Sequence, residues 1–166
     1  MPRVAGLNAV AILAATLAFY VVGAMFYGFI FMETWSQEML VNHGMEPAAA
    51  HALTGEALRT AGTSIPGSMD MATSYGIGFV VSLVTTIGIA LVLKMAKPAS
   101  IMSALGTAFI LWVCFAATGL AYNVLYSTES KTIFVIDLAH LLTAFLLSSA
   151  VLFLIDGKAL SGRTSA

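Results

Sequence analysis

The sequence predicts an all-α membrane protein, in which four transmembrane helices form a bundle with a short amphipathic helix between helices 1 and 2. Of its 166 residues, 60% are hydrophobic and only 9% are charged, whereas about 25% are charged in an ordinary soluble domain. Four stretches also reach the roughly 20 apolar residues that a helix needs to cross a bilayer. They lie at residues 7–32, 72–93, 101–126 and 132–156. A chain of this length forms a single transmembrane domain over residues 1–166.

The first span, residues 7–32, contains no charged residue. Its apolar core exceeds the roughly 7–15 residues of a signal peptide and lacks a small-residue cleavage site at its end, so we expect it to be retained. Small side chains gather on one side of this helix and allow another helix to approach closely. They are Ala11, Ala14, Ala15 and Ala18, followed by Gly23 and Gly28.

Residues 33–70 are expected to be the one sizeable extramembrane segment, because they hold five of the eight acidic residues, two of the three histidines and no long apolar run. Glu46-Pro47 is typical of a helix start and Gly62 of a helix end. Three weakly apolar residues follow at helical spacing: Ala50, Leu53 and Ala57. We expect this amphipathic helix to lie along the membrane surface or to cover the bundle. A turn over residues 63–68 then leads back to the bilayer.

The remaining spans are joined by short links. Glycine and hydroxyl residues interrupt the second span, and they favour close helix packing over a polar transport path. Lys94, Lys97 and Pro98 make a basic turn into the third span, whose Cys114 lies in an apolar run and is interpreted as a packing residue. Residues 127–131 form a tight link to the fourth span, and Gly157 is expected to end that helix.

Basic residues predict the orientation of the chain in the membrane. Under the positive-inside rule, the side with more Lys and Arg faces the cytoplasm. That side has Arg3, Lys94, Lys97, Lys158 and Arg163, and the other has Arg59 and Lys131. Both termini are therefore expected in the cytoplasm and residues 33–70 outside, together with Glu129. In a bacterial host the membrane is the inner membrane. The net charge of −1 gives no basic surface for nucleic acid.

The fourth span carries an acid and an imidazole three positions apart, Asp137 and His140, which share one helix face. Facing lipid is costly for both, so we expect the pair to point toward neighbouring helices. At a rise of ~1.5 Å per residue the two groups lie about 7 Å and 12 Å from the outer end of the span. Residues at a similar depth complete a predicted outer-side polar cluster of Asn123, Asp137 and His140 with Tyr27, Tyr122 and Tyr126.

Three interpretations of this cluster remain open. The favoured one is structural, since polar groups at this depth bond across helices and fix their packing. A second is a functional site, either a proton relay or a pocket for a lipid headgroup or quinone. The third is a tetrapyrrole ligated by His140, although a single intramembrane histidine excludes a bis-histidine haem within one chain. His43 and His51, with Glu46 between them, match no zinc pattern, so no metal site is predicted.

Three short motifs follow one another along the chain: Gly23-Ala-Met-Phe26-Tyr27 with Phe31 and Trp35, Leu111-Trp112-Val113-Cys114-Phe115, and Ile136-Asp137-Leu-Ala-His140-Leu, with Asn8 ahead of them. Together they resemble the small bacterial membrane proteins grouped as domain of unknown function 1761. In that family's pattern, Trp, Gly and Asn are usual where this chain has Phe26, Cys114 and Asp137. The resemblance covers nearly the whole chain and implies four transmembrane helices without an established activity.

Two functions follow as hypotheses. The abundance of small-residue faces and the slight extramembrane part favour an accessory subunit that associates with other membrane proteins or with itself, surrounded by membrane lipids. The alternative is a carrier or enzyme for a small lipophilic molecule, such as a lipid, quinone or tetrapyrrole, that uses the outer-side cluster. The sequence contains no G-x-S-x-G, H-E-x-x-H, phosphate-binding loop or C-x-x-C motif, which favours a role other than catalysis.

Overall fold

The computed structural model describes residues 3–4, 6–65, 70–127 and 130–162. Its elements, in chain order, are β1 (Arg3–Val4), β2 (Leu7–Asn8), α1 (Ala9–Met25), η1 (Phe26–Ile30), α2 (Met32–Asn42), α3 (Pro47–His51), α4 (Gly55–Thr63), α5 (Met71–Ala96), α6 (Ile101–Leu111), η2 (Trp112–Ala117), α7 (Thr118–Tyr126) and α8 (Lys131–Leu160). The segments η1 and η2 are π-helical and continue the helices that precede them.

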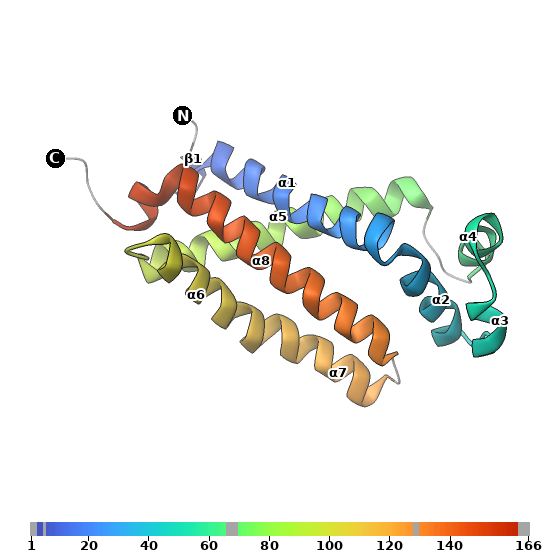
Figure 1. Ribbon diagram of the computed structural model, residues 1–166. Coiled ribbons are helices and arrows are strands. Elements are labelled where there is room, and N and C mark those ends of the chain that lie inside the picture. The colour runs from blue at the N-terminus through green and yellow to red at the C-terminus, as the bar shows by residue number, and fades with distance from the viewer. Residues whose placement is uncertain (1–2, 5, 66–69, 128–129, 163–166) are drawn as a thin grey trace.

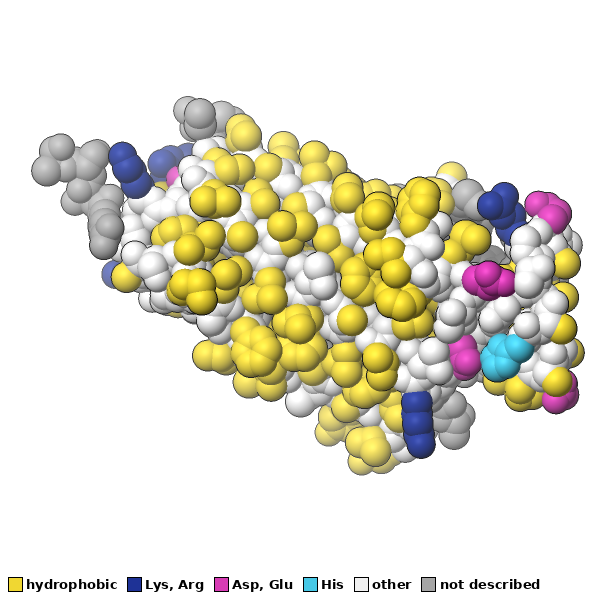
Figure 2. Space-filling view, in the orientation of Figure 1, with side chains coloured by type: hydrophobic (Ala, Val, Ile, Leu, Met, Phe, Trp, Pro, Cys, Tyr) yellow, Lys and Arg dark blue, Asp and Glu magenta, His cyan; other side chains and the backbone are white. Residues whose placement is uncertain are grey.

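Four helices of the described chain are long and apolar enough to cross a membrane (Figure 1). They span Ala9–Ile30, Ala72–Ala96, Ile101–Tyr126 and Lys131–Leu160. Figure 2 shows an apolar surface over the middle of the bundle, with charged side chains gathered at its two ends. The predicted fold class, a four-span helical membrane protein with helical structure between the first two spans, is confirmed.

Helices α1 and α8 form the centre of the bundle, and small residues set the distance between them. Ala11 and Ala15 on α1 are buried, as are Ala144 and Ser148 on α8. The hydroxyl of Ser148 donates a hydrogen bond across the seam to the carbonyl oxygen of Ala15, at 3.0 Å. Backbones approach this closely only where side chains are small, so the alanine face predicted on the first span is an interface with the fourth.

The extramembrane segment packs around a small core of its own. Leu40 of α2, Ala50 of α3 and Leu58 of α4 are buried together. The start at Glu46-Pro47 is confirmed, because the Glu46 carboxylate accepts the N–H of Ala49 at 2.9 Å. The single helix predicted from there to Gly62 is wrong, since residues 52–54 separate α3 from α4.

The break between α3 and α4 also changes which residues face the core. Gly55 begins α4 with a φ of +52°, a conformation that glycine adopts without a steric penalty. In one continuous helix Ala57 would share a face with Ala50, but after the break Leu58 is buried and Ala57 is exposed. Of the predicted apolar stripe, Ala50 is buried and Leu53 is half-buried. The third position is one residue later than predicted, at Leu58 in place of Ala57. Residues 66–68 of the predicted turn lie outside the described chain.

Local capping determines where the spans begin and end. Asp70 caps α5 by accepting the backbone N–H of Thr73 at 3.0 Å and its hydroxyl at 2.5 Å, and these hydrogen bonds lower the pKa of the Asp70 carboxyl. The regular part of α8 ends at Asp156, which departs from helical geometry with φ −126° and ψ 23°, one residue before the predicted end at Gly157. A further helical turn continues to the buried Leu160, and Gly162, at a φ of +68°, follows it.

The register of the extramembrane core yields a first prediction. A Leu58→Glu variant loses buried leucine packing and places an unpaired carboxylate in that core, at a cost of about 3 kcal/mol or more. We expect faster proteolysis within residues 40–65 of the purified protein in detergent. Ala57→Glu, the neighbouring control on the exposed side, should be cleaved at the parent rate. Equal cleavage of both variants would contradict the register.

Candidate functional site

Tyr27, Asp137 and His140 form a hydrogen-bonded triad inside the bundle. The Tyr27 Oη lies 2.6 Å from Asp137 Oδ1 and 3.0 Å from His140 Nδ1. Asp137 and His140 stand on the same face of α8, and both point toward η1, which continues α1. The tyrosine thus bridges the acid and the imidazole from the opposite helix.

The position of Tyr27 depends on the π-helical segment. Tyr27 is the second residue of η1, and a π turn holds one residue more than an α turn, which changes the direction of the side chains around it. Its ring also packs against Trp35 of α2, with the ring centroids 5.3 Å apart. The bridge is therefore held from both sides, by α8 and by the start of the extramembrane segment.

Aromatic rings enclose the imidazole of His140. Its ring centroid lies 6.2 Å from that of Phe19, 5.7 Å from that of Phe26 and 4.9 Å from that of Tyr27. The far nitrogen, Nε2, is buried and has no hydrogen-bond partner in the described part of the protein. A Cβ atom on Gly23 would stand 3.3 Å from this nitrogen, so the glycine allows the backbone of α1 to pack closely against it.

The contacts of the triad limit where its protons can lie. Tyr27 has one hydroxyl proton, and we assign it to the shorter contact, with Asp137. His140 then donates its Nδ1 proton to the Tyr27 oxygen, and Nε2 carries an unpaired lone pair. A proton that arrives at Nε2 can move on in two shifts, from Nδ1 to Tyr27 and from Tyr27 to Asp137. The imidazole and phenol end neutral, and the carboxylate becomes a carboxylic acid.

The other three predicted cluster residues do not join the triad. Tyr122 and Tyr126 stack on each other on α7, with ring centroids 5.4 Å apart, and 65% and 77% of their surfaces are exposed. Asn123 is also exposed, and its side chain makes no hydrogen bond with the triad within the described residues. The depth estimate put these groups at the level of Asp137, but α7 presents them to the outside of the bundle.

The structure adds polar contacts that the sequence does not indicate. Glu38 of α2 accepts a short hydrogen bond from the hydroxyl of Ser130, the N-cap of α8, and the Asn42 side-chain oxygen accepts the Ser130 N–H at 3.2 Å. Glu38 also pairs with His51 of α3 at 3.2 Å. These contacts fasten the extramembrane segment to the first residues of α8, two turns before Asp137. No spacing in the sequence connects Glu38 with Ser130.

His140 does not fit the tetrapyrrole interpretation. Its Nδ1 is engaged by Tyr27, so Nε2 is the nitrogen that would ligate a metal. The backbone of α1 at Gly23 faces that nitrogen, and a macrocycle centred about 2 Å from Nε2 would collide with it. The described residues also include no group of three or more His, Cys, Asp or Glu side chains placed to hold a metal ion.

The part of the chain that contains the triad is matched by a model of a known protein family. A family model described as a protein of unknown function (DUF1761) matches residues 10–153, which include all three triad residues. Comparison with curated proteins and with solved structures found no match.

The bridging role of Tyr27 can be measured by a double-mutant cycle. Tyr27→Phe and Asp137→Leu each remove one partner of a hydrogen bond in low dielectric, which costs about 1–3 kcal/mol. Because both variants break the same contact, the double variant should lose at least about 1 kcal/mol less than the sum of the single losses. Thermal unfolding in detergent measures these losses. Tyr122→Phe is the control and should match the parent, whereas strictly additive losses would disprove the bridge.

Proposed function

The chain belongs to the family of proteins of unknown function DUF1761, and from the geometry of its triad we propose that it binds a small lipophilic molecule inside the membrane. The ligand carries a hydroxyl or phenol group on an apolar body, as a quinol does. It enters from the half of the bilayer that adjoins the extramembrane segment. Its polar group bonds to His140, and its proton exchanges with Asp137 through Tyr27.

The observation that carries this proposal is the buried Nε2 of His140. A buried polar atom without a hydrogen bond costs about 1–3 kcal/mol, and in a native protein such an atom calls for an explanation. A ligand hydroxyl that bonds to Nε2 would satisfy it. Phe19 and Phe26 offer the apolar, ring-lined wall that a lipophilic ligand requires.

The relay explains why three polar residues would serve one ligand. A hydroxyl proton given to Nε2 does not leave a charged imidazolium, because the two shifts through Tyr27 carry a proton on to Asp137. The negative charge passes from the Asp137 carboxylate, which becomes neutral, to the ligand oxygen, which is left as an anion until the proton returns. Exchange of this kind needs no oxidant or reductant, only a ligand that donates and takes back one proton.

An accessory subunit is the second candidate function, and the third span favours it. In an apolar 18-residue stretch of that span only 11% of the residues are buried inside the protein, against 22–33% in the corresponding stretches of the other three. Several large apolar side chains are exposed along it: Met102, Phe109, Ile110, Phe115, Leu125 and Tyr126. This face would be available to another membrane protein or to a second copy of the chain, with lipid covering it otherwise.

We place the protein in the inner membrane of a bacterium, with both termini in the cytoplasm. The described basic residues support this orientation, since Arg3 and Lys158 lie together at the N-terminal hairpin, with Lys94 beside Gly6 and Lys97 beside Gly162. Arg59 and Lys131 lie at the other end, among the acidic residues of the extramembrane segment. Arg163 and Glu129, which also entered the charge count, lie outside the described residues.

Ligand binding is tested by adding a methyl group next to Nε2 of His140. Gly23→Ala places a methyl group 3.3 Å from Nε2 and should lower the amount of co-purifying lipophilic molecule at least about tenfold. The protein is purified in mild detergent, extracted with organic solvent, and measured by absorption spectroscopy and mass spectrometry. Gly28→Ala is the matched control, because nothing lies within 4 Å of its added methyl group.

The same purification separates the two candidate functions. Equal ligand content in the Gly23→Ala and parent proteins would refute binding at this site. A second membrane protein, or a second copy, recovered at a fixed ratio without any lipophilic molecule would favour the accessory subunit. Size-exclusion chromatography with light scattering gives that ratio.

The orientation is tested with reporter fusions. A reporter that is active only in the cytoplasm should be active after residue 166 and silent when inserted near Gly62, because the basic end is expected to face inward. A reporter that is active only outside the cytoplasm should give the reverse pattern. An active cytoplasmic reporter near Gly62 would overturn the orientation.

A further inference from the structure

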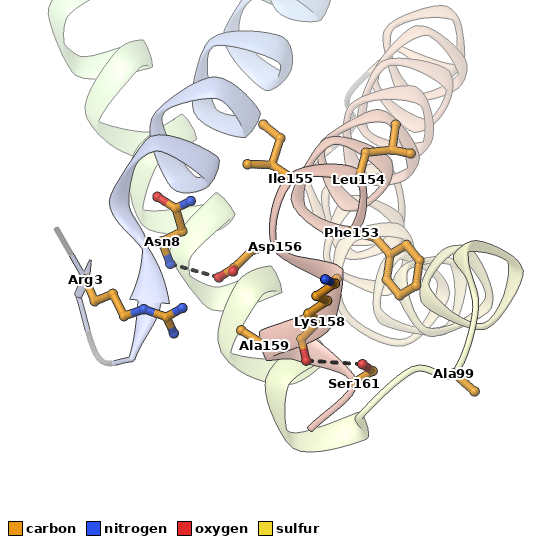
Figure 3. Close-up of a pocket in the computed structure, with 11 residues that line it drawn as sticks. Arg3, Asn8, Ala99, Phe153, Leu154, Ile155, Asp156, Lys158, Ala159 and Ser161 are labelled. Atoms are coloured by element: carbon orange, nitrogen blue, oxygen red, sulfur yellow. Dashed lines mark hydrogen bonds between the residues drawn. The ribbon is translucent and has the colours of Figure 1, made fainter. Parts of the chain in front are cut away.

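A cavity of about 660 Å³ opens at the end of the bundle opposite to the triad (Figure 3). We call it the terminal cavity, and its polar lining residues are Arg3, Asn8, Asp156, Lys158 and Ser161. It lies between the N-terminal hairpin and the last turns of α8. The cavity therefore combines residues from the two ends of the sequence.

The N-terminal hairpin holds Arg3 at this cavity. Strand β1 pairs with β2 so that Arg3 lies opposite Asn8, and Gly6 makes the turn with a φ of +76°. Arg3 Nη1 donates to the Gly6 carbonyl oxygen at 3.1 Å. A guanidinium has five N–H donors in a fixed fork, so this bond positions the group and leaves further donors for an anion.

A kink in α8 forms the opposite wall. Asp156 departs from helical geometry, with φ −126° and ψ 23°, and its Oδ2 accepts the backbone N–H of Asn8 at 2.9 Å. Beyond the kink, Lys158 lies between Asp156 and Ser161 along the cavity wall (Figure 3). The carboxylate thus ties the last turn of α8 to the start of α1, and the lysine side chain is exposed.

The balance of charge around the cavity is positive. Arg3 and Lys158 outnumber Asp156 among the lining residues. Lys94 stands against the hairpin, because a Cβ on Gly6 would come within 2.6 Å of its Nζ. Lys97 lies against Gly162 in the same way, because a Cβ added to Gly162 would stand 3.6 Å from the Cδ of Lys97. A concave surface with this excess of positive charge attracts an anion.

The apolar wall of the cavity indicates which kind of anion. Phe153, Leu154 and Ile155 continue from the polar residues up the fourth span, away from the end of the bundle (Figure 3). Leu154 is 73% exposed and Ile155 is 44% exposed, so both present apolar surface to the bilayer. A soluble phosphate ester would gain nothing from this wall, whereas the acyl chains of a lipid would lie along it.

We propose that the terminal cavity is a binding site for a membrane phospholipid. The phosphate of the headgroup lies between Arg3 and Lys158, and the acyl chains run beside Leu154 and Ile155. Basic pockets at this level of a membrane bind phospholipid headgroups in the same physical way. The site is separate from the triad and does not depend on the function proposed for it.

Native mass spectrometry of the full chain tests this site. The protein is purified in a neutral detergent, stripped of lipid and titrated with phosphatidylglycerol. Arg3→Gln and Lys158→Gln should each weaken lipid binding about fivefold, and the double variant about thirtyfold. Lys131→Gln removes a lysine from the other end of α8 and should bind as the parent does. Parent-like binding by the double variant would overturn the proposal.

Two further measurements show whether the cavity binds a lipid or a soluble phosphate. Inorganic phosphate added in excess should not displace the lipid, and displacement would assign the cavity to soluble phosphate esters instead. Leu154→Ser keeps every charge and should still weaken lipid binding, while Val135→Ser, exposed on the same helix at the triad end, should not. Equal binding by these two serine variants would show that the apolar wall takes no part.

Discussion

The close packing of α1 against α8 is the constraint on which the rest of the structure depends. Contacts between them follow one antiparallel register: Asn8 with Asp156, Ala15 with Ser148, Gly23 with His140 and Tyr27 with Asp137. Each step forward from Asn8 to Tyr27 is matched, to within one residue, by a step back from Asp156 to Asp137. Small residues occupy the middle of this seam and polar pairs its ends, so the distance set by the alanines also positions both polar sites.

This arrangement explains why polar groups are tolerated at those two places. A carboxylate shielded from water is costly without a hydrogen bond, but Asp137 receives the Tyr27 hydroxyl and Asp156 the Asn8 N–H. In both pairs the donor comes from the other helix, so the bond exists only while the seam is closed. The triad end is further held by α2, which contacts Ser130 ahead of α8. Packing and polar chemistry are therefore coupled along one helix pair.

The sequence was sufficient to predict features that depend only on the order and spacing of residues along the chain. Hydropathy over a long window located the four spans, and helical spacing put Asp137 and His140 on one face. It failed where rotation about a helix axis decides the outcome. Tyr27, Tyr122 and Tyr126 have similar predicted depths, and only the π segment and the packing of α1 select Tyr27. The break before Gly55 and the kink at Asp156 likewise depend on backbone φ values that the sequence alone does not reveal.

The unpartnered atoms of the protein are not equivalent, and the difference bears on whether the triad is only structural. Among the described residues, Thr86 and Ser149 also have buried side-chain oxygens without a hydrogen-bond partner, and Trp112 has a buried indole nitrogen without one. A hydroxyl on a helix can rotate toward the carbonyl one turn back, so its deficit is small and local. The imidazole of His140 cannot, because Tyr27 holds its other nitrogen and three aromatic rings fix its plane. A triad that served packing alone would be equally stable with a side chain that has a hydrogen-bonding atom at the position of Nδ1 and none at the position of Nε2. The second nitrogen, which is buried beside Gly23 without a hydrogen-bond partner among the described residues, is the feature that packing does not require.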